Sequence, residues 1–172
     1  MATSLYELSI GSYLQMLEAA VGFLAKGAEH FAAAGVDPNE VVSFSLYEDM
    51  APFHFQAVSI VHHSLGAVKG MQAGEFGPPN GYPETDFAGL QKLVSDALAE
   101  LKGLDAAAVN QLEGGRVSFK LGEVEIPFTN ENFVMSFSLP NLYFHAATAY
   151  DILRTKGVPV GKRDFLGALR MG

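Results

Sequence analysis

The sequence predicts a mainly α-helical protein: one bundle of four long helices, with a small β-hairpin inserted before the last core helix. Three observations favour this fold. Apolar residues recur at three- and four-residue spacing through four long stretches. The period changes to two in one short stretch between the third and the fourth of them. The chain has 172 residues, a length that one hydrophobic core commonly serves, so we expect residues 1–172 to form a single domain.

The first predicted helix runs from about Ser4 to Ala34. Its apolar residues form one stripe at helical spacing, with Leu17 and Leu24 in the middle of the run. Gly35 is a plausible C-terminal stop, because glycine adopts the left-handed conformation that commonly ends a helix. Asp37 to Glu40 then contains a proline and short polar residues, which indicates a turn or a short helical connector.

The second predicted helix runs from about Asp49 to Met71, and the third from about residue 85 to residue 104. Asp49 would cap the second helix, and Pro52 is tolerated in its first turn, where a missing N–H costs nothing. Thr85 or Asp86 would cap the third helix. The segment between them, GEFGPPNGYP, consists of turn-forming residues and is predicted to be a loop.

A period of two begins after the third helix. Val117, Phe119 and Leu121 alternate with polar residues, and after Gly122 a second alternation follows at residues 124–128. This pattern predicts a hairpin that must pack on the helices to be stable. Residues 132–138 fit neither period clearly. The fourth helix starts at Ser138 or Pro140 and ends near Gly157, and the tail after it would either dock through Phe165 and Leu166 or fray.

The composition excludes several classes of protein. The formal charge of −8 and the lack of a basic run argue against nucleic-acid binding and against docking on anionic membranes. The absence of cysteine excludes disulfides, thiolate metal ligands and cysteine nucleophiles. We see no signal peptide and no apolar run of about 18 residues, so we expect no membrane span and a cytoplasmic protein.

His145 is the strongest candidate for a functional residue. It lies in the middle of a helix that is apolar on most sides, so its imidazole is expected to be buried and to point into the bundle. A buried neutral imidazole needs a hydrogen-bond partner for at least one nitrogen. The ring is therefore either a core histidine satisfied by a carbonyl, a tyrosine or a carboxylate, or a ligand-binding or catalytic group.

Two further histidines, His62 and His63, are neighbours on the second helix. Successive residues of an α-helix point about 100° apart, so only one of the two is expected to face the core. His62 shares a stripe with Val58 and Phe55, which makes it the candidate to meet His145 across the bundle. His54 lies two turns from His62, about 12 Å along the axis, and is predicted to be a surface or rim residue.

Three groups of residues resemble a known superfamily over nearly the whole chain. The first is Asp49, Met50, Pro52 and Gln56, and the second is Asp86, Phe87 and Leu90. The most specific is the run PNLYFH at residues 140–145, followed by the TAY, ILR, GV and GKRDFLG segments up to residue 167. These residues resemble the DinB/YfiT-like superfamily of small bacterial four-helix-bundle proteins, many of them metal-dependent enzymes. Within it, the chain resembles a branch described as a domain of unknown function.

The resemblance implies a position for a divalent metal. Metal-binding members of the superfamily carry His-x-x-x-His on the last core helix and a third histidine on the second helix. His145 matches the second position of that motif, but Asn141 stands at the first. The implied set is therefore His62, His145 and Asn141 around Zn, Ni or Mn. Zn and Ni prefer imidazole to an amide oxygen. Gln56, Thr148 and Tyr143 are expected to line the cleft around this set.

Three functional hypotheses follow. The first is a small-molecule binding site, or a vestigial metal site, in the cleft that contains His145. The second is a divalent-metal-dependent enzyme of hydrolase or thiol-transferase type that uses His62 and His145, with the metal polarising a substrate or activating a water or a thiol. The third is a non-catalytic homodimeric interaction module. The sequence assigns no reaction and no substrate.

Overall fold

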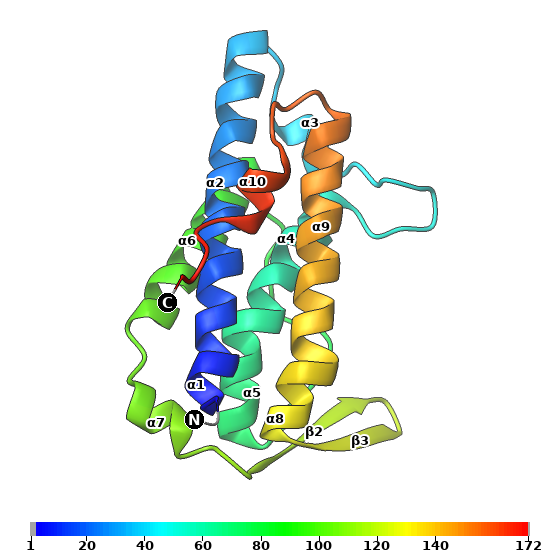
Figure 1. Cartoon of the computed structure of the whole chain (residues 1–172). Coiled ribbons are helices and arrows are strands. Elements are labelled where there is room, and N and C mark those ends of the chain that lie inside the picture. Colours follow the sequence, from blue (N-terminus) through cyan, green and yellow to red (C-terminus); the bar gives the residue numbers. More distant parts are fainter. Residues whose placement is uncertain (1–2, 172) are drawn as a thin grey trace.

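The computed structural model describes residues 3–171 and confirms the predicted architecture of a helical bundle with a small hairpin at one end (Figure 1). The second long helix is divided by a π-helical segment, η1. The helices that form the bundle are α2 (Ile10–Ala34), α4 (Phe53–Val61) with η1 (His62–Gly66) and α5 (Ala67–Ala73), α6 (Phe87–Lys102), and α9 (Leu139–Thr155).

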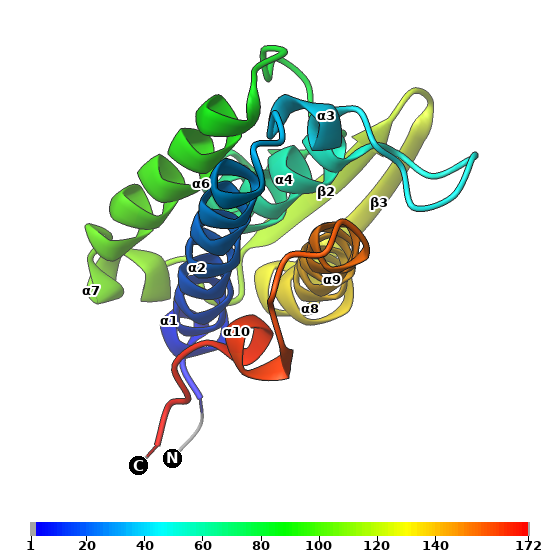
Figure 2. The same ribbon diagram turned by 90° about the horizontal axis from the view of Figure 1, so that it is seen from above.

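Each bundle helix packs against two others (Figure 2). Helix α2 contacts α6 and α9, and α4 contacts the same two helices from the opposite side. Helix α6 runs in the same direction as α4 and α5, toward the end of the bundle that carries the hairpin. The loop of residues 77–86 must therefore run back along the bundle before α6 begins.

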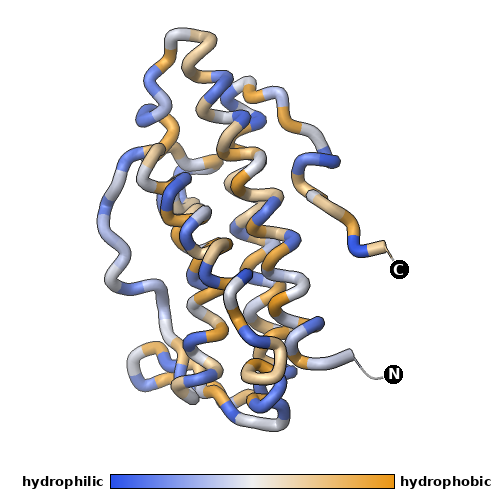
Figure 3. Tube along the Cα trace, turned by 90° about the vertical axis from the view of Figure 1, so that its left-hand side faces the viewer, coloured by the Kyte–Doolittle hydropathy of each residue, from blue (hydrophilic) through white to orange (hydrophobic). Residues whose placement is uncertain are grey.

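Aromatic side chains fill the centre of the bundle. The ring of Phe53 stacks on Phe87, with centroids 5.8 Å apart and planes within 7°, and Phe31 meets Phe87 edge to face. Phe53 and Phe87 have almost no exposed surface. Hydrophobic and hydrophilic stretches alternate along the long helices, as expected for helices with one buried face (Figure 3). Burial of these rings and of the aliphatic side chains around them stabilises the bundle.

The ends of the helices follow the predicted signals with one exception. The Asp86 side chain caps α6 by accepting a hydrogen bond from the Gly89 amide, and Gly35 ends α2 in the left-handed conformation with a φ of 66°. The prediction that Asp49 caps the second helix is wrong. Helix α4 begins at Phe53, after Pro52 in an extended conformation. Proline disfavours the helical conformation in the residue before it, so the helix starts three residues later than the cap pattern indicated.

The predicted hairpin is confirmed and carries a third strand. Strands β2 (Arg116–Leu121) and β3 (Val124–Thr129) are antiparallel, and β1 (Glu75–Phe76) adds to β2 in parallel. Strand β1 lies in the segment predicted to be a loop, because glycines and prolines surround its two residues. Pro127 stands in the edge strand opposite Ser118, and a residue without an N–H makes that edge a poorer template for pairing.

The ambiguous residues before the fourth helix are helical. Helix α8 (Asn130–Phe133) continues through a second π-helical segment, η2 (Val134–Ser138), directly into α9. Short helices complete the chain: α1 (Leu5–Leu8), α3 (Asn39–Val42), α7 (Ala106–Asn110) and α10 (Lys162–Leu166).

The C-terminal tail docks on the bundle. Helix α10 packs on α2, where Asp164 accepts a hydrogen bond from Lys26 at 2.7 Å. The ring of Phe165 meets Tyr150 of α9 edge to face, with centroids 5.8 Å apart. Of the two outcomes that the sequence left open, docking through Phe165 is the one observed.

We expected no membrane span from the sequence, but one N-terminal stretch, which forms α1 and α2, meets the criteria of length and hydropathy for a span. Residues Leu5–Ala34 are long and apolar enough to cross a membrane by length and composition, with a mean hydropathy of 1.3. Half of the residues in the qualifying window are buried in the bundle, and the core helix of a soluble protein passes the same test.

Candidate functional site

The π-helical segment η1 places two adjacent histidines inside the bundle. His62 is 9 % exposed and His63 is 6 % exposed. In a regular α-helix two neighbours point about 100° apart, so one of them would be expected outside. The wider turn of a π-helix brings successive side chains closer in direction, and π-helical turns are frequent at functional sites. The expectation that only one of these residues faces the core is therefore wrong.

His62 is held by an aromatic ring and by a backbone carbonyl. Its ring stacks on Phe76 of β1, with centroids 4.4 Å apart, and its Nε2 lies 2.8 Å from the carbonyl oxygen of Gly77. A carbonyl oxygen only accepts hydrogen bonds, so Nε2 carries the proton and Nδ1 carries a lone pair. The ring is thus fixed in position and in tautomer by the residues that the sequence placed in a loop.

His63, and not His62, lies against His145. The two rings are stacked, with centroids 5.6 Å apart and planes within 12°. This corrects the prediction that His62 meets His145 across the bundle. The physical reason is the π-helical segment η1, which begins at His62. Its wider turn changes the direction of the side chains after α4, so His62 does not continue the stripe of Phe55 and Val58. Nδ1 of His63 is buried and has no hydrogen-bond partner within residues 3–171, which is unusual for a buried polar atom.

A buried chain of hydrogen bonds fixes the backbone at His63. The Ser138 hydroxyl donates to the carbonyl oxygen of His63 at 2.6 Å, and the Tyr13 hydroxyl lies 2.7 Å from the Ser138 oxygen. Since Ser138 uses its proton on the carbonyl, Tyr13 donates to Ser138. Burial raises the pKa of Tyr13, which keeps this hydroxyl protonated. The chain ties η1 to η2 and to α2.

His145 is oriented by a glutamine that is itself fixed. Nδ1 of His145 lies 2.8 Å from Oε1 of Gln56, and Nε2 of Gln56 donates to the carbonyl oxygen of Ala51 at 2.8 Å. The second bond sets the orientation of the amide, because the carbonyl only accepts. Oε1 therefore accepts from His145, so Nδ1 of His145 carries the proton and Nε2 carries a lone pair. Nε2 has no hydrogen-bond partner among the described residues.

The outer edge of His145 lies among aromatic side chains that reach the surface. His145 is half-buried, whereas the sequence predicted burial on several sides. Phe55 and Phe144 meet its ring edge to face, with centroids 5.7 and 5.3 Å away, and both are partly exposed. These residues, with Gln56 and His63, form what we call the His145 cluster.

The other predicted cleft residues lie apart from the polar atoms of this cluster. The Thr148 hydroxyl is buried and donates to the carbonyl oxygen of Phe144, one turn back on the same helix. The Asn141 side chain donates in the same way to Phe137. Tyr143 is 41 % exposed. Of the three predicted cleft-lining residues, Gln56 is the one whose side chain is hydrogen-bonded to His145.

His62, His63 and His145 have pKa values below the ordinary value of histidine. Burial, together with the neighbouring His62 and His145, which would repel its charge, lowers the pKa of His63 to about 3. Burial, with His62 as the second cause, lowers the pKa of His145 to about 4. Burial also lowers the pKa of His62, against the opposing effect of the Gly77 carbonyl. All three rings are neutral at pH 7.

The observed donor set does not fit the metal site that the superfamily implies. Asn141 is turned to its own helix, and His62 stacks on Phe76 and not on His145. The nearly parallel rings of His63 and His145 point their lone pairs in parallel planes, so they do not converge on one ion at the 2.0–2.1 Å that zinc requires. Across residues 3–171, no three histidine or carboxylate side chains gather in a way that could hold a metal ion.

Sequence reasoning missed two residues of this region, Phe76 and Ser138. Phe76 was assigned to a loop, although a large aromatic residue among turn residues is a sign that the segment docks on the core. Ser138 was read as the start of a helix. A serine inside an apolar helical run was the available signal, because such a hydroxyl is either exposed or bonded to a backbone carbonyl.

Comparisons with known proteins agree with this fold. A family model described as a domain of unknown function, DUF1993, matches residues 5–166. No curated protein sequence matches the chain. Among solved structures, the crystal structure of a DinB family member protein from Shewanella denitrificans is similar, with a TM-score of 0.77 and 24 % identity over 98 % of this chain and 94 % of that one. The chain therefore has a DinB-like fold and belongs to the DUF1993 family.

Proposed function

We propose that the protein binds a small neutral molecule at the His145 cluster, without a metal ion. The ligand has an aromatic or apolar body and one O–H or N–H donor. The observation that carries this proposal is the 2.8 Å hydrogen bond between Nδ1 of His145 and Oε1 of Gln56. It fixes the tautomer of His145, so Nε2 is an acceptor that no group within residues 3–171 uses.

The surroundings of this acceptor support a neutral, partly apolar ligand. The lowered pKa of His145 keeps the ring uncharged at neutral pH, so the site offers a lone pair and not a cation. Phe55 and Phe144 provide ring edges next to it that a flat apolar group can cover. An apolar surface with one oriented polar group is typical of small-molecule sites.

Phenol is a suitable probe, and toluene is its matched control without a hydroxyl. We expect phenol to bind more tightly than toluene, and the His145→Phe variant to lose about five- to tenfold of its affinity for phenol, since one net hydrogen bond is removed. Binding is measured by NMR titration of the 15N-labelled protein, with the amide signals of residues 55–56 and 144–145 as the readout. Toluene affinity should change little in this variant.

A control variant separates this effect from a general loss of histidine. His30→Phe removes a ring that lies against Phe31 at the other end of the bundle, and should leave phenol binding unchanged. If His145→Phe proves too unstable, Gln56→Leu releases Nδ1 and should lower the preference for phenol over toluene. Equal affinities for phenol and toluene in the unmodified protein would contradict the proposal.

Metal content is a second test of the same proposal. Protein purified without a histidine tag is expected to hold less than about a tenth of an equivalent of Zn, Ni or Mn, with no recovery when these ions are added. Elemental analysis measures this directly. A full equivalent that is lost in His145→Phe and kept in His30→Phe would instead support the alternative, a metal-dependent enzyme of hydrolase or thiol-transferase type.

The predicted homodimer and the predicted cytoplasmic location stay predictions. Tyr143 and Phe144, at 41 % and 57 % exposed, are side chains through which a second copy would pack if the protein is a homodimeric interaction module.

A further inference from the structure

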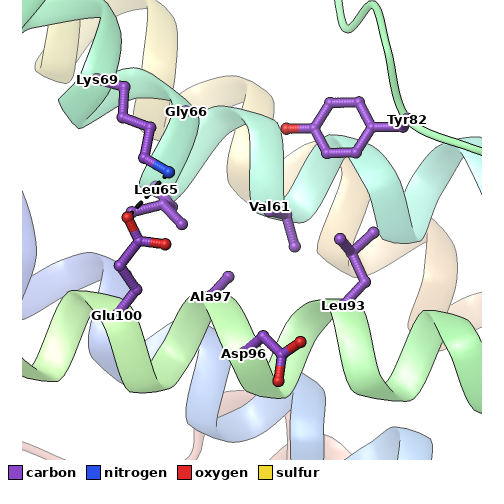
Figure 4. A pocket seen from close by; sticks show the side chains of 9 residues that line it. All are labelled: Val61, Leu65, Gly66, Lys69, Tyr82, Leu93, Asp96, Ala97 and Glu100. Carbon is purple, nitrogen blue, oxygen red and sulfur yellow. Dashed lines mark ion pairs between the residues drawn. The ribbon is translucent and has the colours of Figure 1, made fainter.

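A groove separate from the His145 cluster lies between η1–α5 and α6 (Figure 4). Its volume is about 260 Å³. Four apolar side chains provide its surface: Val61 and Leu65 from one side, and Leu93 and Ala97 from α6. At the roughly 30 Å³ that one water occupies in the liquid, this space corresponds to about nine non-hydrogen atoms. The groove is thus large enough for a single small ring with a short substituent.

One end of the groove is open because residue 66 is glycine. A Cβ atom at Gly66 would lie 3.3 Å from Nδ1 of His62 and 3.8 Å from the hydroxyl oxygen of Tyr82. Any larger side chain would fill this end. The two polar atoms are therefore left facing the same small space, and neither has a hydrogen-bond partner among residues 3–171.

Both of these atoms have a defined hydrogen-bonding role. His62 is nine-tenths buried and gives its Nε2 proton to Gly77, so Nδ1 is an acceptor. Burial raises the pKa of Tyr82, which keeps its hydroxyl protonated. The loop that carries Tyr82 runs along the bundle and is fixed by the contact of Gly77 with His62. The side chain of Tyr82 points across the groove (Figure 4).

The opposite end of the groove carries two carboxylates, each paired with a lysine. Glu100 forms an ion pair with Lys69 at 2.9 Å through Oε1, and Asp96 is paired with Lys92 through Oδ2. Each carboxylate has a second oxygen that is outside these pairs. Figure 4 shows that the second oxygen of Glu100 points into the groove, toward the end where Tyr82 lies. Of the lining residues, two are acidic and one is basic, and the whole chain has a formal charge of −8.

We propose that this groove binds a small organic cation, a primary ammonium on an apolar body of about seven carbon atoms. The ammonium donates to the free oxygen of Glu100, and the apolar body covers Val61, Leu65 and Ala97. A hydroxyl or amide substituent on the ligand reaches Tyr82 and Nδ1 of His62. The lining thus complements the ligand along its whole length, with a carboxylate at one end and an acceptor–donor pair at the other.

Three probes with one ring and different charges test this proposal: benzylamine, benzyl alcohol and benzoate. We expect benzylamine to shift the amide signals of residues 65–66, 82 and 96–97 in NMR titrations. Benzyl alcohol should bind about tenfold more weakly because it lacks the charge-assisted hydrogen bond, and benzoate should not bind. Equal binding of all three, or signal changes elsewhere and none in the groove, would overturn the proposal.

Two variants place the binding in the groove. Glu100→Gln should weaken benzylamine binding about tenfold and leave benzyl alcohol unchanged, whereas Ala97→Leu fills the groove and should abolish both. Glu29→Gln, which removes an exposed carboxylate of α2, is the matched control and should have no effect. If Glu29→Gln weakens binding as much as Glu100→Gln, the attraction is nonspecific and the proposal fails. His145→Phe should leave benzylamine binding intact, so this result does not depend on the proposed function.

Discussion

Replacing Ser138 with alanine is expected to lower the free energy of unfolding by about 2–3 kcal/mol, although the change removes a single oxygen atom. Ser138 is fully buried and is the middle of the chain that joins Tyr13 to the carbonyl of His63. Its loss leaves both the Tyr13 hydroxyl and the His63 carbonyl inside the bundle without a partner. An unpaired buried polar group costs the full desolvation penalty, about 1–3 kcal/mol for each group.

The reason for this large effect is that Ser138, the last residue of η2, is hydrogen-bonded to a residue of the other π-helical segment, η1. A π-helical turn leaves backbone groups with weaker partners than an α-helical turn, and the carbonyl of His63 in η1 finds its partner in η2. The bond therefore stabilises the local distortion that brings both His62 and His63 inside. Without it, we expect η1 to relax and the NMR signals of residues 62–66 to shift.

Urea unfolding of four variants tests this explanation. Ser136→Ala, an exposed serine of the same π-helical segment, should cost less than about 0.5 kcal/mol. Tyr13→Phe should cost about 1 kcal/mol, because Ser138 keeps its bond to His63. The double variant Tyr13→Phe/Ser138→Ala should lower the free energy of unfolding by less than the sum of Tyr13→Phe and Ser138→Ala. It contains no unpaired tyrosine hydroxyl. If Ser138→Ala costs no more than Ser136→Ala, the hydrogen-bonded chain is not what stabilises η1.

The sequence predicted the bundle well because its signals are local and repeated. The stripe of α6, its cap at Asp86 and the glycine stop of α2 at Gly35 each depend on a few neighbouring residues, and all are observed. The alternation that defines the hairpin is equally local. The cap at Asp49 failed because the sequence pattern gave no weight to Pro52, which is itself extended and disfavours a helical residue before it.

The candidate site was predicted in part, and the errors share one cause. The prediction that His62 contacts His145 assumed a regular α-helix, in which successive side chains point about 100° apart. The segment η1 is a π-helix and does not have that spacing. Its stabilising partner, Ser138, lies 75 positions away in the chain and gives no local signal. Phe76 likewise depends on a tertiary contact with His62, so turn residues around it concealed its role. Helix periodicity cannot register such long-range contacts.

Acid is expected to destabilise the protein at pH values where the carboxylates are still ionised. The pKa of His63 is about 3 in the folded state, against about 6.5 in an unfolded chain. Above pH 6.5 neither state binds a proton, so no stability is lost. Between pH 6.5 and about 3 the unfolded state binds a proton that the folded state does not, and stability falls by about 1.4 kcal/mol per pH unit. At pH 5 His63 should therefore lower the free energy of unfolding by about 2 kcal/mol relative to pH 7.

His145 adds a smaller effect of the same sign. Its pKa is about 4 in the folded state, and because water screens this half-buried ring, we expect it to add about 1 kcal/mol at pH 5. Urea unfolding at pH 7, 6 and 5 measures the sum. The paired carboxylates of Glu75, Glu131 and Asp164 have lowered pKa values and do not titrate in this range.

The variant His63→Phe identifies the residue responsible. Phenylalanine fits a position between the rings of Phe76 and Phe137, and it removes a buried nitrogen that has no partner. This variant should be at least as stable as the unmodified protein at pH 7 and should lose about 2 kcal/mol less stability than that protein by pH 5. His30→Phe should keep the full pH dependence. If His63→Phe and the unmodified protein lose stability in parallel between pH 7 and pH 5, His63 already accepts a proton in the folded bundle. Its ring would then be hydrated, and the stacked, neutral pair that underlies the His145 cluster would not exist in solution.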